Sequence, residues 1–105
     1  MSIEDQVKIL ERLVEIMKAS AAGSYERLEC EFGYETYENG WSVGSKYSQV
    51  KNGQVMSELL DDPGDEASDL VHELHRLMKS HAGGAWDGFL LSVDFSGKAD
   101  AKFIY

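Results

Sequence analysis

Residues 25–47, YERLECEFGYETYENGWSVGSKY, decide the fold, because apolar and polar side chains alternate along them with a period of two. Such alternation is typical of strands with one buried face and one exposed face. Asn39-Gly40 follows the first run and is a dipeptide that favours the positive φ angles of a tight hairpin turn. The segment therefore predicts two antiparallel strands, residues 25–37 and 41–47.

A helix is predicted on each side of this hairpin region. Residues 2–22 carry apolar side chains at helical spacing, and a glycine follows them. A second helix begins after Asp62 and Pro63, which suit the N-cap and the first helical position. It has its own apolar stripe and ends at the glycine pair 83–84.

Three further strands complete the predicted sheet. Residues 49–56 suit a short third strand, which Asn52-Gly53 either ends or turns. Residues 89–95 and 99–105 show period-two alternation and are joined by a Ser-Gly-Lys turn. The order of elements is therefore α-β-β-β-α-β-β.

This order predicts a single α+β domain, residues 1–105, in which two helices pack on one face of an antiparallel sheet of about five strands. We expect these side chains to be buried beneath the helices: Leu28, Cys30, Phe32, Leu91, Val93 and Phe95. The other face is predicted to be exposed and mostly acidic, with Glu29, Glu31, Glu35, Asp94, Asp100 and Lys102.

The charge balance is strongly acidic. Ten Lys and Arg stand against 19 Asp and Glu, which gives a formal net charge of −9. A field of this sign repels phosphate backbones, so we expect a basic partner and no direct binding of nucleic acid. No apolar run approaches the roughly 20 residues needed to cross a bilayer, and no secretory signal is visible. We therefore expect a cytoplasmic protein that makes no membrane contact.

Three features invite a chemical site, and each has a simpler interpretation. His72 and His75 are spaced to share a helix face, but the His-Glu-x-x-His pattern is absent, which favours solvated or capping histidines over metal ligands. Cys30, the single cysteine, lies among apolar neighbours that favour an inert core thiol. The acids around Asp61 lack the ligand alternation of a calcium loop. We expect no enzymatic activity, no metal and no cofactor.

The acids form two runs. Residues 26–38 contain five acids and one arginine, and residues 58–73 contain seven acids and no lysine or arginine. These runs either keep a small domain soluble or form a docking surface for a cationic protein. The neighbouring aromatic residues Tyr34, Tyr37, Trp41 and Tyr47 are either core residues or interface anchors. The predicted partner-binding residues are Glu29, Glu31, Glu35, Asp61, Asp62, Asp65, Glu66 and Asp69.

The stretch 85–98, AWDGFLLSVDFSGK, with residues 102–105, KFIY, resembles the end of the YezG-like immunity proteins. In that family a Trp opens a strand, a Gly-Lys turn follows, and an aromatic-rich strand closes the sheet. The N-terminal half matches by pattern alone. The resemblance implies a non-catalytic antitoxin that neutralises a toxin, often a nuclease, in competition between bacteria. It carries over no site residue.

Charge and resemblance together predict an immunity protein that binds a basic, nuclease-type toxin domain in the cytoplasm and blocks it. A nuclease needs a basic cleft, and an acidic inhibitor complements that cleft. The alternative is a small acidic dimeric scaffold or regulatory adaptor that has no toxin partner and self-associates through its exposed sheet face. A third alternative is an acidic metal- or ligand-binding domain.

Overall fold

The computed structural model describes residues 3–21, 25–60, 62–80 and 86–104. Its elements are α1 (Ile3–Ser20), β1 (Arg27–Tyr37), β2 (Gly40–Lys51), β3 (Gln54–Glu58), a 3₁₀ turn η1 (Pro63–Asp65), α2 (Glu66–Ser80), β4 (Gly88–Asp94) and β5 (Ala99–Ile104). This order confirms the predicted α+β fold. Among the described residues, no helix is long and apolar enough to cross a membrane.

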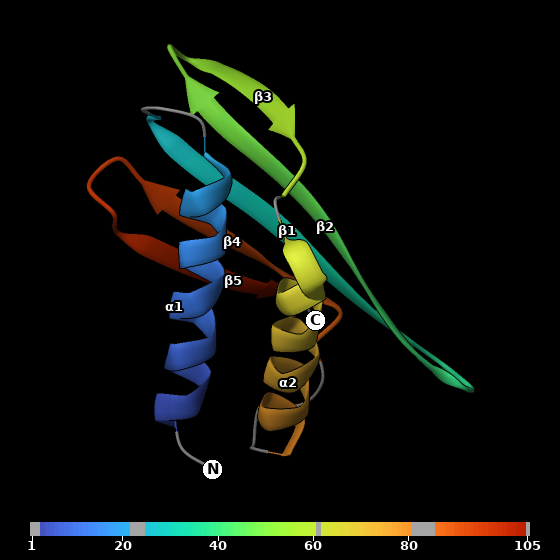
Figure 1. The fold of residues 1–105 in the computed structure, drawn as a ribbon. Coiled ribbons are helices and arrows are strands. Elements are labelled where there is room, and N and C mark those ends of the chain that lie inside the picture. Colours follow the sequence, from blue (N-terminus) through green and yellow to red (C-terminus); the bar gives the residue numbers. More distant parts are fainter. Residues whose placement is uncertain (1–2, 22–24, 61, 81–85, 105) are drawn as a thin grey trace.

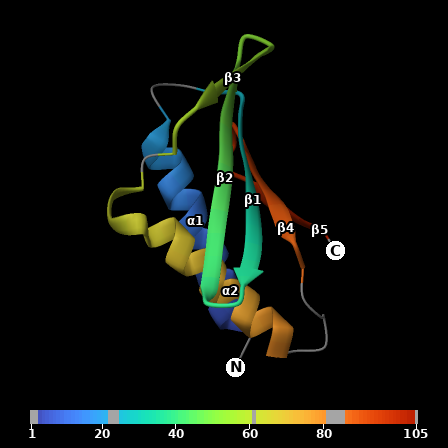
Figure 2. The same cartoon turned by 90° about the vertical axis from the view of Figure 1, so that its right-hand side faces the viewer.

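The five strands form one antiparallel sheet in the order β3-β2-β1-β4-β5. Strand β1 is central and lies between β2 and β4 (Figure 1). Both helices lie on the same face of the sheet, as predicted (Figure 2). The opposite face, which we call the open face, has no helix over it among the described residues.

The two Asn-Gly pairs behave differently. Asn52 and Gly53 have φ angles of 52° and 74° and form the tight turn between β2 and β3. The predicted turn at Asn39 and Gly40 is wrong in detail, because neither residue has a positive φ and Gly40 already pairs with Tyr37. Residues 49–51, predicted in the third strand, belong to β2 because the chain turns only after them.

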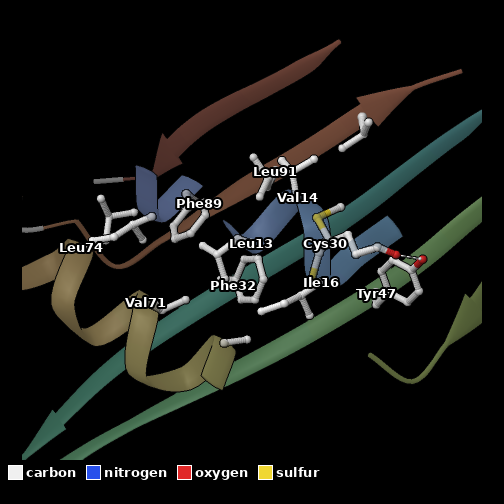
Figure 3. Close-up of a cluster of buried hydrophobic side chains, with 14 of the residues drawn as sticks. Leu13, Val14, Ile16, Cys30, Phe32, Tyr47, Val71, Leu74, Phe89 and Leu91 are labelled. Atoms are coloured by element: carbon white, nitrogen blue, oxygen red, sulfur yellow. Dashed lines mark hydrogen bonds between the residues drawn. The ribbon is translucent and has the colours of Figure 1, made fainter. Parts of the chain in front are cut away.

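The core lies between the helices and the sheet (Figure 3). The side chains of five residues predicted to be buried are at most 1% exposed, which confirms the register of β1 and β4. These residues are Leu28, Cys30, Phe32, Leu91 and Val93. They share one cluster with Leu13 of α1 and with Val71 and Leu74 of α2. Full burial of each large apolar side chain contributes about 1.5–3 kcal/mol.

Phe95 is 81% exposed, so its predicted burial is wrong. Strand β4 ends one residue earlier, at Asp94, whose Oδ1 accepts hydrogen bonds from Ser96 N, Ser96 Oγ and Lys98 N at 3.0, 2.6 and 3.0 Å. The Ser96 hydroxyl, with the backbone donors, holds the pKa of Asp94 below its usual range. This turn removes Phe95 from the alternation of the strand.

The second helix starts later than predicted. Pro63 does occupy the first position after Asp62, but it opens the 3₁₀ turn, and α2 begins at Glu66. Asp62 still caps the helix, because its carboxylate oxygens accept hydrogen bonds from Ala67 N at 2.9 and 3.0 Å. The predicted helix end at residues 83–84, and the predicted site residue Asp61, lie outside the described residues.

A buried hydrogen bond links α1 to the sheet. The Tyr47 hydroxyl donates to the carbonyl oxygen of Met17 at 2.8 Å, and Tyr47 is 3% exposed (Figure 3). Met17 lies in the last turn of α1, where carbonyl groups have no partner within the helix. The hydroxyl therefore satisfies an acceptor that would otherwise be buried without a donor.

We expect Tyr47→Phe to lower the free energy of unfolding by about 1–3 kcal/mol, because it leaves the Met17 carbonyl unpaired. Tyr37→Phe is the matched control, since it removes an exposed hydrogen bond to Glu35 and should change stability by less than about 0.5 kcal/mol. Urea denaturation followed by circular dichroism measures both. Equal losses for the two variants would contradict this role of Tyr47.

Candidate partner-binding surface

Strands β1 and β2 extend beyond the rest of the sheet. Strand β4 pairs with β1 only from Arg27 to Gly33, whereas β2 pairs with it as far as Tyr37. Residues 34–43 therefore form a projecting hairpin, which we call the arm (Figure 1). Of the four aromatic residues predicted to be core or anchors, Tyr34 and Tyr47 are buried. Tyr37 and Trp41, both in the arm, are 59% and 37% exposed.

Stacked rings attach the arm to α2. The Trp41 ring lies on the His72 imidazole with a centroid distance of 4.1 Å and an interplanar angle of 6°. A 2.8 Å hydrogen bond joins Tyr34 Oη to His72 Nδ1, and the Tyr34 ring stacks on His75 at 4.1 Å. The interpretation of these histidines as solvated or capping is wrong, because both pack against aromatic rings of the sheet.

The environment of His75 favours its neutral form. His75 is 9% exposed and also meets the edge of Trp86, with a centroid distance of 4.8 Å. Burial lowers the pKa of His75 below its usual range; the nearby charge of Lys79 acts in the same direction, and a hydrogen bond with the Trp86 backbone opposes it. A neutral imidazole therefore completes the packing between α2 and the sheet.

Cys30 has the surroundings of a core residue. Its side chain is fully buried, and burial raises the pKa of the thiol to about 12. A protonated thiol at neutral pH is neither a nucleophile nor a metal ligand. No group of three His, Cys, Asp or Glu side chains in the described parts of the chain is arranged to hold a metal ion.

Glu29, Glu31 and Glu35 lie on the open face, but cations share it. The register places Lys46 directly opposite Glu31, and Arg27 Nε lies 3.3 Å from Glu29 Oε1. The exposed charge of β1 is thus partly neutralised along the strand. The open face is mixed in charge, and Glu35 alone of the three lies within the arm.

The acids at the start of α2 lie on the helix side of the sheet and have different roles. Glu66 is paired with Arg12 of α1 through contacts of 2.6 Å (Nε–Oε2) and 2.8 Å (Nη2–Oε1). This hydrogen bonding to Arg12 lowers the pKa of Glu66. The Asp62 carboxylate caps the helix. Asp65 and Asp69 are exposed and form no ion pair with a described residue.

Asp65 and Asp69 lie on the same side of the molecule as Trp41. Asp69 precedes His72 by one helical turn, and His72 carries the Trp41 ring. A cleft of about 210 Å³ lies between the α2 entry, including Asp65, and Val43 of β2. We call Trp41, Asp65 and Asp69 the Trp41 surface. This surface combines one residue of the arm with two of the predicted partner-binding acids. It lies on the opposite side of the sheet from Glu29 and Glu31.

No family model matches the chain. A stretch of 78 residues, 72% of the chain, is 37% identical to a protein of Stenotrophomonas maltophilia described as a "Chorionicgonadotropic hormone-like protein". The match covers 18% of that protein, so the chain spans less than a fifth of the length of the curated relative it matches.

We expect wild-type stability to fall between about pH 7 and pH 5, partly because of His75. Its pKa is lowered in the folded state, so the unfolded chain binds more protons in this range and stability rises with pH. His75→Phe keeps an aromatic ring without a charge and should flatten this part of the profile. The free energy of unfolding, measured at a series of pH values for both proteins, tests this. Profiles of equal slope would show that His75 does not titrate differently on folding.

Proposed function

We propose that the chain is a non-catalytic immunity protein that binds a cognate basic toxin domain, of nuclease type, and blocks it. The Trp41 surface is the observation that carries the proposal. It presents a large aromatic ring and two carboxylates that have no cation partner among the described residues. An exposed anchor beside free negative charge suits a cationic protein surface.

The contacts that hold the Trp41 ring in place favour a binding role for the Trp41 surface. The Trp41 ring is held by His72, which is itself fixed by Tyr34, so the anchor is ordered before a partner arrives. Preorganised side chains lose little conformational entropy on binding. A formal net charge of −9 adds long-range attraction, which speeds encounter with a cationic partner by roughly 10–10³-fold.

The same chemistry argues for inhibition of a nuclease type of toxin. A nuclease needs cationic side chains where it holds phosphates, and a carboxylate pair placed over them competes for the same charges. The chain's own acidic field disfavours direct contact with nucleic acid. We place this action in the cytoplasm, where a lone thiol such as Cys30 stays reduced. The proposal involves no membrane and no cofactor.

A dimeric scaffold or adaptor is the second candidate function. Apolar side chains on the open face favour it, because Ile104 is 45% exposed and Val55 is 70% exposed. Such side chains suit self-association of that face. In that case the acidic residues keep the molecule soluble and do not bind a toxin.

Association kinetics with a purified, cognate basic toxin domain of nuclease type test the proposal. We expect Asp65→Lys with Asp69→Lys to lower the association rate constant about tenfold or more and to weaken its dependence on salt. Glu29→Lys with Glu31→Lys is the matched control on the open face and should have a smaller effect. Equal effects of the two double variants would show that the charge acts without a docking site.

Trp41→Ala should act mainly on dissociation. Loss of a central aromatic anchor costs about 2–4 kcal/mol, so the dissociation rate constant should rise by at least about 30-fold. Trp41→Phe keeps a ring on His72 and should give an intermediate value. Circular dichroism spectra and melting temperatures establish that the variants remain folded. A folded Trp41→Ala variant with unchanged dissociation, or a wild type that forms no complex, would contradict the proposal.

A further inference from the structure

Strand β5 is an open edge of the sheet. It pairs with β4 on one side, and the described residues provide no strand on the other (Figure 2). The carbonyl oxygen of Lys98 accepts a hydrogen bond from Asp94 N at 3.0 Å, and that of Ile104 accepts one from Asp87 N at 2.8 Å. The even-numbered residues of β5 therefore direct their backbone groups towards β4. Because antiparallel pairing alternates, Ala99, Ala101 and Phe103 direct their backbone groups outward.

A groove runs along this edge on the helix side. It encloses about 430 Å³ between α1 and β5, and its apolar lining includes Val7 and Leu10 of α1 and Ala99 and Ala101 of β5. The groove is open because the short side chains of these two alanines do not fill the space beside α1. Val7 is 44% exposed at this groove.

The open face of β5 carries two opposite charges. Asp100 and Lys102 are exposed and lie opposite the uncharged residues Ser92 and Leu90 of β4. Neither forms an ion pair with a described residue. The strand therefore presents one acid and one base, two residues apart, at an edge with free backbone groups.

We propose that a second copy of this chain pairs with β5 as an antiparallel strand, with Ala101 opposite Ala101 of the second copy. In this register Asp100 lies opposite Lys102 of the second copy, and Lys102 lies opposite Asp100. Each pair is a cross-strand ion pair on the open face. The outward backbone groups of the two strands meet and continue the sheet through the dimer.

Charge selects this register over its neighbours. A slip of two residues one way places Asp100 opposite Asp100 and Lys102 opposite Lys98 of the second copy. A slip of two residues the other way places Lys102 opposite Lys102. Like charges directly opposite are destabilising, and a slip of one residue brings side chains from opposite faces together. The proposed register is the one in which both charged residues are complemented.

The helix side supports the same register. Ala99 lies opposite Phe103 of the second copy, so a large ring stands beside the short side chain that leaves the groove unfilled. The Phe103 ring is already held by Phe89 and Trp86, at centroid distances of 5.2 and 5.5 Å. The ring thus extends the apolar surface of one copy towards the groove of the other.

A second copy fits this edge better than a basic peptide does. A cationic strand would be opposed by Lys102, whereas the pattern of β5 complements itself. The other edge strand, β3, offers no such pattern, because Gln54–Glu58 contains no lysine or arginine. The dimer is independent of the toxin-binding proposal, since it forms without any other protein.

Oligomeric state measured by sedimentation equilibrium tests the inference. We expect the wild type to dimerise reversibly at micromolar to millimolar concentration in about 0.15 M salt, which screens the repulsion between two chains beyond about 8 Å. Asp100→Lys and Lys102→Asp should each weaken the dimer about 10- to 100-fold, because each places like charges opposite at two sites. Glu58→Lys is the control, because it makes the same change of charge as Asp100→Lys on an exposed residue of β3, the other edge strand.

Recombination of the charges makes the test specific. A mixture of Asp100→Lys and Lys102→Asp chains should form heterodimers about as strong as the wild-type dimer, because every charge again faces its opposite. The double variant Asp100→Lys with Lys102→Asp should dimerise alone and keeps the wild-type net charge. A monomeric wild type would overturn the inference. So would a dimer that the single variants leave unchanged, or one that the mixture and the double variant fail to restore.

Discussion

Strand β1 is paired along both edges, and this double pairing positions the rest of the molecule. Strand β2 follows it to Tyr37, and β4 joins it from Arg27 to Gly33. The approach of β4 is so close that a Cβ at Gly88 would lie 2.5 Å from the carbonyl oxygen of Phe32. Both helices pack on the apolar face of β1, so a slip of one residue would turn that face outward.

Two surfaces follow from where this pairing stops. The arm exists because β1 continues past the end of its pairing with β4. In the arm, Tyr34 of β1 and Trp41 of β2 point towards α2 and stack on its histidine rings. The open edge exists because β5 pairs only with β4 among the described strands. The proposed toxin surface lies on the helix side of the arm, and the proposed dimer forms along the edge strand β5.

The alternation of β1 and β4 is enough to predict the fold, because side-chain direction in a strand is a local property. Tertiary contacts decide what the sequence does not predict. Phe95 leaves the strand because the Asp94 carboxylate gathers three hydrogen bonds into a turn. The stacking of His72 on Trp41 joins residues far apart in the chain, as does the pairing of Glu66 with an arginine of α1. No spacing in the sequence marks these contacts, so the acids at the α2 entry are indistinguishable from the sequence alone.

Amide hydrogen exchange of the chain, alone and with a cognate basic toxin domain of nuclease type, locates the surface that the partner covers. Exchange slows where a partner covers backbone amides or stabilises them against opening. We expect added protection in the arm, residues 34–43, and in the first turns of α2, with little change at β5. Protection confined to the open face around Glu29 and Glu31, or none in the presence of the toxin domain, would contradict it.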